Sequence, residues 1–395
     1  MNRVPVVSAE GKPLMPTKPS KARKLVKSGK AVGKWSKLNQ YYIQLTFSPS
    51  GEDTQSISCG IDPGKHYGSV GIQSSKFTLL TSHIFLPFET VKKRMEQRAL
   101  MRSSRRGRRI NRKLPYELRA HRQCRFSNRK QAKLPPSIRA NCQLLLRVVT
   151  ELSKVYPINS IVYEYCKADV DLTSGRKKAK SGSCFSPVMV GQAWILKQLS
   201  NIAPITKKLG WQTSNLRKHL GLTKQKHFKG DITPATHAVD AVTLASFAFI
   251  DYLPYENSEG RGHTWKGQVT VTDAPFFVIR RPPISRRQLH LMVFSKGGKR
   301  RKYGGTVTRH GIRKGDLVVA ERKGVKYIGW CSGDTKSQVS VSDSNWKRLG
   351  QFSKNKTRLL KRSTGLICKQ LIGGRRFFPT LISPKYSAGL HAEEG

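Results

Sequence analysis

Short apolar runs separated by turn residues dominate the first part of the chain. Residues 4–7 and 41–47 are rich in β-branched and aromatic side chains, which predicts two strands. Between them, the basic segment 18–29 repeats its apolar residues at helical spacing, which predicts a helix. We therefore expect residues 1–55 to form a small basic unit of strands around one helix.

The next β-prone run, residues 56–62, ends at Asp62. Pro63-Gly64 follows as a turn, and a second apolar run begins at residue 69. This pattern predicts a hairpin whose first strand ends at Asp62 and holds its carboxylate on rigid sheet. The alternative is that Asp62 only initiates the Pro-Gly turn.

The middle of the chain alternates between helical and strand patterns. Residues 136–152 carry an apolar face at helical spacing after Pro136, and residues 188–209 resume such a pattern. Residues 160–165 form a β-branched run that contains Glu164. A charge in such a strand needs a partner, unless Glu164 faces solvent at an edge of the sheet.

A later helix places an acidic and a basic side chain together. Asp231 or Thr233 can cap its start, and Pro234 suits its first turn. His237 and Asp240 are three residues apart, so they share a helix face at the head of an apolar segment. This predicts a site, with a capping or surface pair as the alternative.

The last third of the chain predicts β structure. Residues 254–267 are rich in Gly, Glu and Asn and predict a linker. Beyond it, short strands separated by turn signals favour a small β-barrel or sandwich. Those strands are expected at 276–279, 288–294, 316–319, 327–330 and 338–341.

The charge of the chain changes this picture from a generic α/β protein to a nucleic-acid-binding one. Its 74 Lys and Arg against 23 Asp and Glu give a formal net charge of +51 in 395 residues, which requires a polyanionic partner. No apolar run reaches the roughly 18 residues of a spanning helix, so we expect no membrane. Seven scattered cysteines with no CxxC pair, and a start without a signal-peptide core, favour a reducing cytoplasm.

Arginine is concentrated in one segment. Residues 91–130 hold sixteen Lys or Arg against Glu96 and Glu117, and the arginines recur every three to four residues, which predicts a helix with a guanidinium face. Such a face suits a phosphate backbone; the alternative is a disordered basic arm. The expected nucleic-acid-binding residues are Arg94, Arg98, Arg102, Arg105, Arg106, Arg108, Arg109 and Arg112, with Lys299, Arg300, Arg301 and Lys302 in a later turn.

The acids that remain suggest phosphodiester chemistry. Asp62, Glu164 and Asp240 supply the hard oxygen ligands that Mg²⁺ prefers, and two such ions about 4 Å apart activate water and stabilise the leaving oxygen. His237 could orient or deprotonate the water, or ligate a metal. We expect two Mg²⁺ ions, with Mn²⁺ as a substitute, and we expect these four residues to be both catalytic and metal-binding.

These motifs, in this order, resemble the IsrB family, relatives of IscB that lack an HNH domain. Residues 12–16 contain its PLMP tetrapeptide, and the arginine helix resembles its bridge helix. Residues 60–64, 161–164 and 237–241 resemble the three segments of its split RuvC nuclease. The interval between the second and third segments holds no HNH-like His/Asn/His set, only His219 and His227, which favours IsrB over IscB.

The resemblance implies an α/β (α+β) fold with an RNase H-like RuvC core. It implies these divisions of the chain: 1–55 the PLMP domain, 56–90 RuvC-I, 91–130 the bridge helix region, 131–185 RuvC-II, 186–255 RuvC-III, and 267–390 a C-terminal β-barrel-like domain that meets a target-adjacent motif.

The implied function is that of an RNA-guided DNA nickase. A guide omega RNA would pair with one strand of double-stranded DNA beside the adjacent motif, and the RuvC site would cut the displaced strand. The implied particle is a monomeric protein in a ribonucleoprotein, in a prokaryotic cytoplasm near the nucleoid. Three alternatives stay open: a guided nuclease that cuts both strands in turn, an RNA-free resolvase of branched DNA, and a non-catalytic basic RNA-binding protein.

Overall fold

The structure is a computed structural model, and it describes most of the chain. The described residues are 2–108, 111–118, 134–166, 187–228, 230–257, 260–283, 308 and 310–371. The predicted strand at 288–294 and the basic turn at 299–302 lie outside them.

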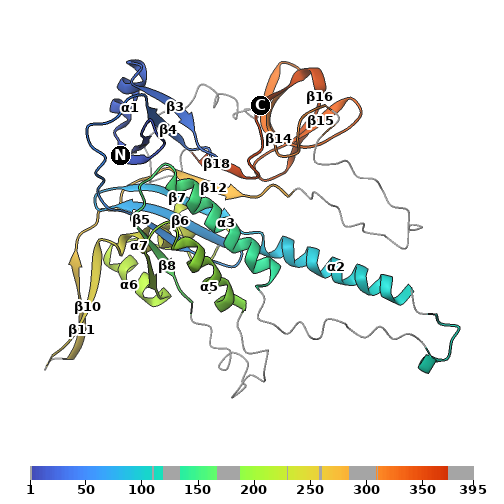
Figure 1. Cartoon of the computed structure of the whole chain (residues 1–395), viewed down its shortest axis with the longest axis horizontal. Helices are drawn as coiled ribbons and strands as arrows, with labels where there is room; N and C mark the ends of the chain where they lie inside the picture. The colour runs from blue at the N-terminus through green and yellow to red at the C-terminus, as the bar shows by residue number, and fades with distance from the viewer. Residues whose placement is uncertain are drawn as a thin grey trace.

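A seven-stranded mixed sheet forms the centre of the molecule (Figure 1). Three successive strands pair antiparallel, a later strand pairs in parallel with the first of them, and a further strand pairs in parallel with that later one. The order β7-β6-β5-β8-β9 is that of the RNase H-like fold, which confirms the mixed α/β class expected from sequence. The strands are β5 (Ile57–Asp62), β6 (Tyr67–Ser74), β7 (Thr78–Phe85), β8 (Ser160–Glu164), β9 (Ile205–Lys208), β12 (Phe276–Arg280) and β18 (Ile367–Leu371).

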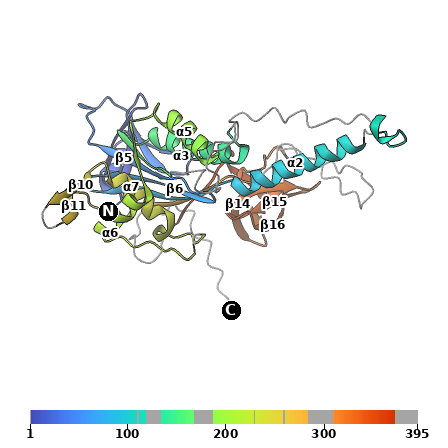
Figure 2. The same ribbon diagram turned by 90° about the horizontal axis from the view of Figure 1, so that it is seen from below.

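Helices cover both faces of this sheet, so its central strands are buried (Figure 2). Helices α3 (Pro136–Ser153) and α5 (Pro187–Leu199) lie on one face, where the apolar stripe of α3 packs against β5 and β6. Each aliphatic side chain buried there contributes roughly 1.5–3 kcal/mol. Helix α7 (Val239–Ser246) lies on the other face, with α6 (Gly210–His219) beside it.

The N-terminal unit contains the two strands and the helix that its pattern predicts, and two further strands, β2 and β3, that it did not predict. A four-stranded sheet of order β2-β1-β4-β3 packs with one basic helix around a small apolar cluster of its own. The elements are β1 (Val4–Val7), β2 (Pro13–Thr17), α1 (Pro19–Lys27), β3 (Ala31–Trp35) and β4 (Tyr41–Leu45).

A five-stranded antiparallel sheet forms the C-terminal unit, in the order β16-β15-β14-β13-β17. The predicted strand at 276–279 does form, but as β12 it pairs in parallel with β7 of the central sheet, and β18 pairs with β12. The C-terminal unit is therefore inserted between two strands of the central sheet. Its elements are β13 (Leu317–Arg322), β14 (Val325–Asp334), β15 (Gln338–Ser342), β16 (Arg348–Ser353), a short turn of helix (Lys354–Lys356) and β17 (Thr357–Lys361).

Two expectations from sequence are wrong. The linker expected at 254–267 is a hairpin of β10 (Ile250–Asn257) and β11 (Gly260–Gly267), because aromatic residues among its glycines and charges favour strands. The helix expected over 188–209 ends at Leu199, because Pro204 cannot continue it, and the chain then forms β9 and α6.

The arginine-rich segment forms α2 (Phe88–Arg108), which extends away from the sheet in Figure 1. This confirms the predicted helix as far as residue 108, and a short 3-10 turn (Tyr116–Leu118) follows. None of the helices in the described ranges combines the length and hydropathy needed to cross a bilayer.

Candidate active site

Asp62 and Glu164 meet because of sheet topology. Asp62 is the last residue of β5, and Glu164 is the last residue of β8. The two strands are adjacent and parallel, with Ile61 opposite Tyr163, so both strands end at the same edge of the sheet. Two residues that are about a hundred positions apart in sequence thus become neighbours.

The pKa of the Glu164 carboxyl is raised to about 8. Burial is the main cause, followed by the negative charge of Asp62, a hydrogen bond with that carboxyl, and the charge of Asp240. Glu164 therefore keeps its proton at neutral pH unless a cation enters. These causes also show that three carboxyl groups share one electrostatic environment.

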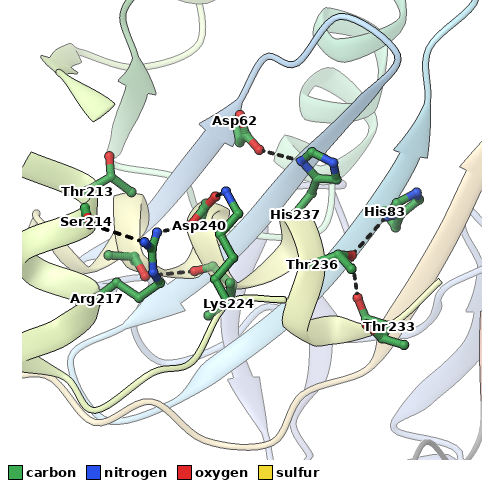
Figure 3. Close-up of polar contacts among 12 residues, drawn as sticks. Asp62, His83, Thr213, Ser214, Arg217, Lys224, Thr233, Thr236, His237 and Asp240 are labelled. Atoms are coloured by element: carbon green, nitrogen blue, oxygen red, sulfur yellow. Dashed lines mark hydrogen bonds and ion pairs between the residues drawn. The ribbon is translucent and has the colours of Figure 1, made fainter. Parts of the chain in front are cut away.

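His237 lies on the turn that precedes α7, and from there it contacts Asp62 at the end of β5. Its Nδ1 lies 3.0 Å from Oδ2 of Asp62 (Figure 3). When the imidazole is neutral and Asp62 is ionised, the carboxylate can only accept, so Nδ1 donates this hydrogen bond. Nε2 is then the acceptor nitrogen, and within the described residues this buried atom has no hydrogen-bond partner.

The turn that carries His237 departs from the helix predicted by sequence. Residues Pro234–Ala238 form a π-helical turn, inside which Thr236 has non-helical φ and ψ of −85° and −107°. The Thr236 hydroxyl donates to the Thr233 carbonyl oxygen at 2.8 Å, which holds this turn in shape (Figure 3). π turns of this kind are frequent at functional sites.

Two aromatic side chains that the sequence analysis did not single out surround the imidazole of His237. The ring of Tyr67 lies 5.8 Å from it, and the ring of His83 lies 5.7 Å from it. Burial lowers the pKa of His83 to about 4, and the neighbouring charges of His237 and Arg280 add to this effect. His83 is therefore neutral and packs as an uncharged ring. A histidine in an apolar strand gives no sequence signal for such a role.

Asp240 contacts a different set of residues from His237, and no observation contradicts the predicted shared helix face, because Ala238 and Val239 between them are helical. It lies in the first turn of α7 and is buried. Its Oδ1 accepts from Nη1 of Arg217 at 2.5 Å, and its Oδ2 accepts from Nζ of Lys224 (Figure 3).

The donor types at this edge fit a divalent metal ion. Carboxylate oxygens and one imidazole nitrogen are ligands that Mg²⁺ and Mn²⁺ accept, and the like-charge pair Asp62–Glu164 gains from a cation. In the part of the chain that the structure describes, no three Asp, Glu, His or Cys side chains converge as closely as the ligands of one ion. Asp62, Glu164, His237 and Asp240 supply the donor atoms that a metal ion needs, but the Asp240 carboxylate is paired with the side chains of Arg217 and Lys224.

Of the predicted nucleic-acid-binding residues, those that the structure describes lie on α2 or just after it. Arg94, Arg98 and Arg102 are on α2, with Arg98 and Arg102 exposed. The side chains of Arg105, Arg106 and Arg108 belong to the same helix but are not described, and Arg112 follows it. Arg109 and the turn Lys299, Arg300, Arg301 and Lys302 lie outside the described residues.

Comparison with known proteins gives one match to a family model and one similar solved structure. A family model described as "RRXRR protein" matches residues 4–183. Residues 105–109 of the chain are Arg-Arg-Gly-Arg-Arg, which fits that description. A solved structure, "T. thermophilus RuvC in complex with Holliday junction substrate", is similar at a TM-score of 0.25 and 11% identity, over 48% of this chain and 90% of that one. No curated protein matches the chain significantly. The family match spans Asp62, the arginine-rich segment and Glu164, and ends before His237.

Proposed function

We propose that this chain is a divalent-metal-dependent endonuclease, and specifically an omega RNA-guided nickase of the IsrB type. The observation that carries the proposal is that Asp62 and Glu164 end adjacent parallel strands of an RNase H-like sheet, where His237 contacts Asp62 and the charges of Asp62 and Asp240 both act on Glu164. They lie in a chain of net charge +51, which suits a nucleic-acid substrate. The family match over residues 4–183 agrees with this assignment.

Asp62, Glu164 and Asp240 would hold two Mg²⁺ ions, with Mn²⁺ as a substitute. Ions bound there supply an activated water and offset the charge that develops on the leaving oxygen. Asp62, at the strand end between Glu164 and His237, is the residue best placed to serve both ions. Glu164 releases its proton when such a cation binds, because the cation removes the like-charge cost that raises its pKa.

His237 would orient the attacking water and take its proton. The Asp62 carboxylate fixes the imidazole through Nδ1, which leaves Nε2 as the basic nitrogen. The neutral rings of Tyr67 and His83 hold the imidazole in place without adding charge. A general base needs a second group that orients it, and Asp62 would supply that orientation.

The rest of the chain would bind the nucleic acids. The arginines of α2 present an exposed cationic face for the guide RNA, where Arg suits phosphate. The C-terminal five-stranded unit would meet the target-adjacent motif in double-stranded DNA. The particle would be a monomer with its RNA, in a prokaryotic cytoplasm.

The test uses the ribonucleoprotein purified from cells that express the chain together with the DNA flanking its gene. A long co-purifying RNA and Mg²⁺-dependent nicking of a duplex matched to that RNA would support the proposal. Cleavage of branched DNA without RNA would instead favour the resolvase alternative. Binding without cleavage, unchanged by Asp62→Ala, would favour a non-catalytic RNA-binding protein.

A further inference from the structure

Two basic side chains converge on Asp240 from different elements, and the roles proposed so far use neither of them. Arg217 comes from α6 and Lys224 from the loop that follows it (Figure 3). Each donates to a different oxygen of the same carboxylate. One cation is enough to neutralise one carboxylate. The presence of a second cation beside Asp240 therefore needs an explanation.

The two cations differ in how firmly they are held. The side chain of Arg217 is 11% exposed, and its second nitrogen, Nη2, also lies 3.3 Å from Oγ of Ser214, one turn earlier on α6. The side chain of Lys224 is 25% exposed, and the structure gives it one hydrogen-bond partner, Asp240. Arg217 is thus fixed at two points, whereas the Lys224 ammonium is a point charge on a flexible stem.

The backbone beneath Lys224 is anchored close to the site. The amide of Leu222 donates to the Arg217 carbonyl at 3.0 Å, and the amide of Gln225 donates to the Ala235 carbonyl at 2.9 Å. The second bond ties this loop to the π turn that carries His237. The stem of Lys224 therefore starts from a fixed point, and only its ammonium has freedom to move within the site.

The ammonium also acts on a second carboxyl group. Its positive charge lowers the pKa of Glu164, against the larger effects that raise it. Lys224 therefore contacts Asp240 and lies close enough to Glu164 for its charge to act on that carboxyl.

We propose that Lys224 is a further catalytic residue of the nuclease, whose ammonium leaves Asp240 and binds a non-bridging phosphate oxygen at the scissile bond. The proposal rests on the nuclease function given above. When metal ions bind Asp240, the Lys224 ammonium would leave this carboxylate and Arg217 would stay, because Arg217 is more deeply buried and is held by Ser214. On the phosphate it would stabilise the charge that grows in the transition state, without forming or breaking a covalent bond.

The test compares Lys224→Ala with Lys226→Ala, which removes the same charge from a position two residues away on the same loop. Both are made in the full chain with its co-purified RNA. One readout is the single-turnover rate on the matched duplex, and the other is Mn²⁺ affinity measured by electron paramagnetic resonance without DNA. Lys224→Arg serves as the conservative variant.

We expect Lys224→Ala to cut on the order of 100-fold more slowly, as for other single donors to a transition state. Its Mn²⁺ affinity should rise several-fold, because a cation that competes for Asp240 is gone. Lys224→Arg should recover much of the rate, and Lys226→Ala should match the wild type in both readouts. An unchanged rate in Lys224→Ala, or a parallel loss of rate and of Mn²⁺ binding, would overturn the proposal, since parallel loss is what a purely structural ion pair predicts.

Cleavage by the wild type and by Asp62→Ala tests the proposed nuclease function independently of the role proposed for Lys224. If the wild type cuts and Asp62→Ala does not, the nuclease assignment stands whatever Lys224→Ala does. If the wild type does not cut, or if Asp62→Ala cuts normally, the nuclease assignment fails, and the Lys224 proposal fails with it.

Discussion

Gly60 of β5 lies directly against Ala241 of α7. A Cβ at position 60 would lie 1.9 Å from the Ala241 backbone oxygen and 2.4 Å from the Ala245 nitrogen. Gly71 on β6 is opposite Gly60, and a Cβ there would lie 3.0 Å from the Ala241 carbonyl carbon. The backbone of α7 therefore rests on two glycines, and this close approach sets the depth of Asp240 relative to Asp62.

We expect Gly60→Ala to destabilise the chain and to weaken metal binding together. The added methyl group meets backbone, which cannot rotate away, so the cost should be at least the roughly 1–3 kcal/mol of an overpacked core. Thermal unfolding and Mn²⁺ binding would measure the two effects. Gly51→Ala is the control, because a Cβ there meets nothing within 4 Å. A Gly60→Ala variant as stable as Gly51→Ala would show that α7 does not rest on β5.

Asp62→Ala should abolish detectable cleavage and keep RNA and DNA binding near the wild-type level. A single carboxylate adds little to a surface of net charge +51, whereas a metal ligand between Glu164 and His237 has no substitute. Cleavage and filter-binding assays on the same preparations would show this. Asp53→Ala removes an exposed carboxylate from the preceding loop and should change neither. A fall in DNA binding in proportion to the fall in cutting would contradict the assignment.

The raised pKa of Glu164 predicts how stability changes with pH in the absence of divalent metal. Between its unfolded value near 4.5 and its folded value of about 8, the native state binds the extra proton. The contribution of Glu164 to the free energy of unfolding is therefore fully present at low pH, and it is lost as the pH rises towards 8. Glu164→Gln removes this contribution, because the amide does not titrate.

Chemical denaturation at several pH values in EDTA would measure the effect. The free energy of unfolding of Glu164→Gln, relative to the wild type, should increase from pH 5 to pH 8. Mg²⁺ should reduce this difference, because the cation favours the ionised wild-type carboxylate. A difference independent of pH would show that Glu164 titrates as an exposed acid does.

The elements that sequence predicted correctly are those whose signals are local. The apolar run that ends at Asp62, and the helical stripe after Pro136, each lie within one element, so periodicity identifies them. The hairpin β10–β11 was missed because its aromatics are diluted by glycine and charge. The ion pair of Arg217 with Asp240 crosses 23 positions and two helices, and no periodic pattern encodes it. The π turn at Pro234–Ala238, with its non-helical Thr236, precedes the regular helix and was not predicted, because it has no periodic signal in the sequence.

Replacing Arg98, Arg102, Arg105 and Arg109 together by Ala should weaken RNA binding and flatten its salt dependence. Each arginine that binds a phosphate contributes about 0.7–0.9 to the slope of log affinity against log salt, so the slope should fall by several units. Binding titrations at increasing KCl concentration would measure it. Glu96→Gln, on the same helix, removes no cation and should not reduce the slope. An unchanged slope in the arginine variant would mean that this face of α2 meets solvent or protein instead of RNA.

The last prediction concerns which DNA strand is cut. The proposed site has one set of ligands, at the edge where β5 and β8 end, so it can act only on a strand threaded past that edge. In a guided complex the target strand is held in a heteroduplex with the RNA, whereas the displaced strand is single and flexible enough to enter. Supercoiled plasmid should therefore give open circles nicked on the displaced strand, with little linear DNA at short times. Strand-specific end labels on a matched duplex would measure the two cuts separately, and an unmatched duplex would serve as the control. Efficient cutting of both labels would mean that the single site serves two strands in turn, and the nickase assignment would give way to that of a nuclease that cuts both strands.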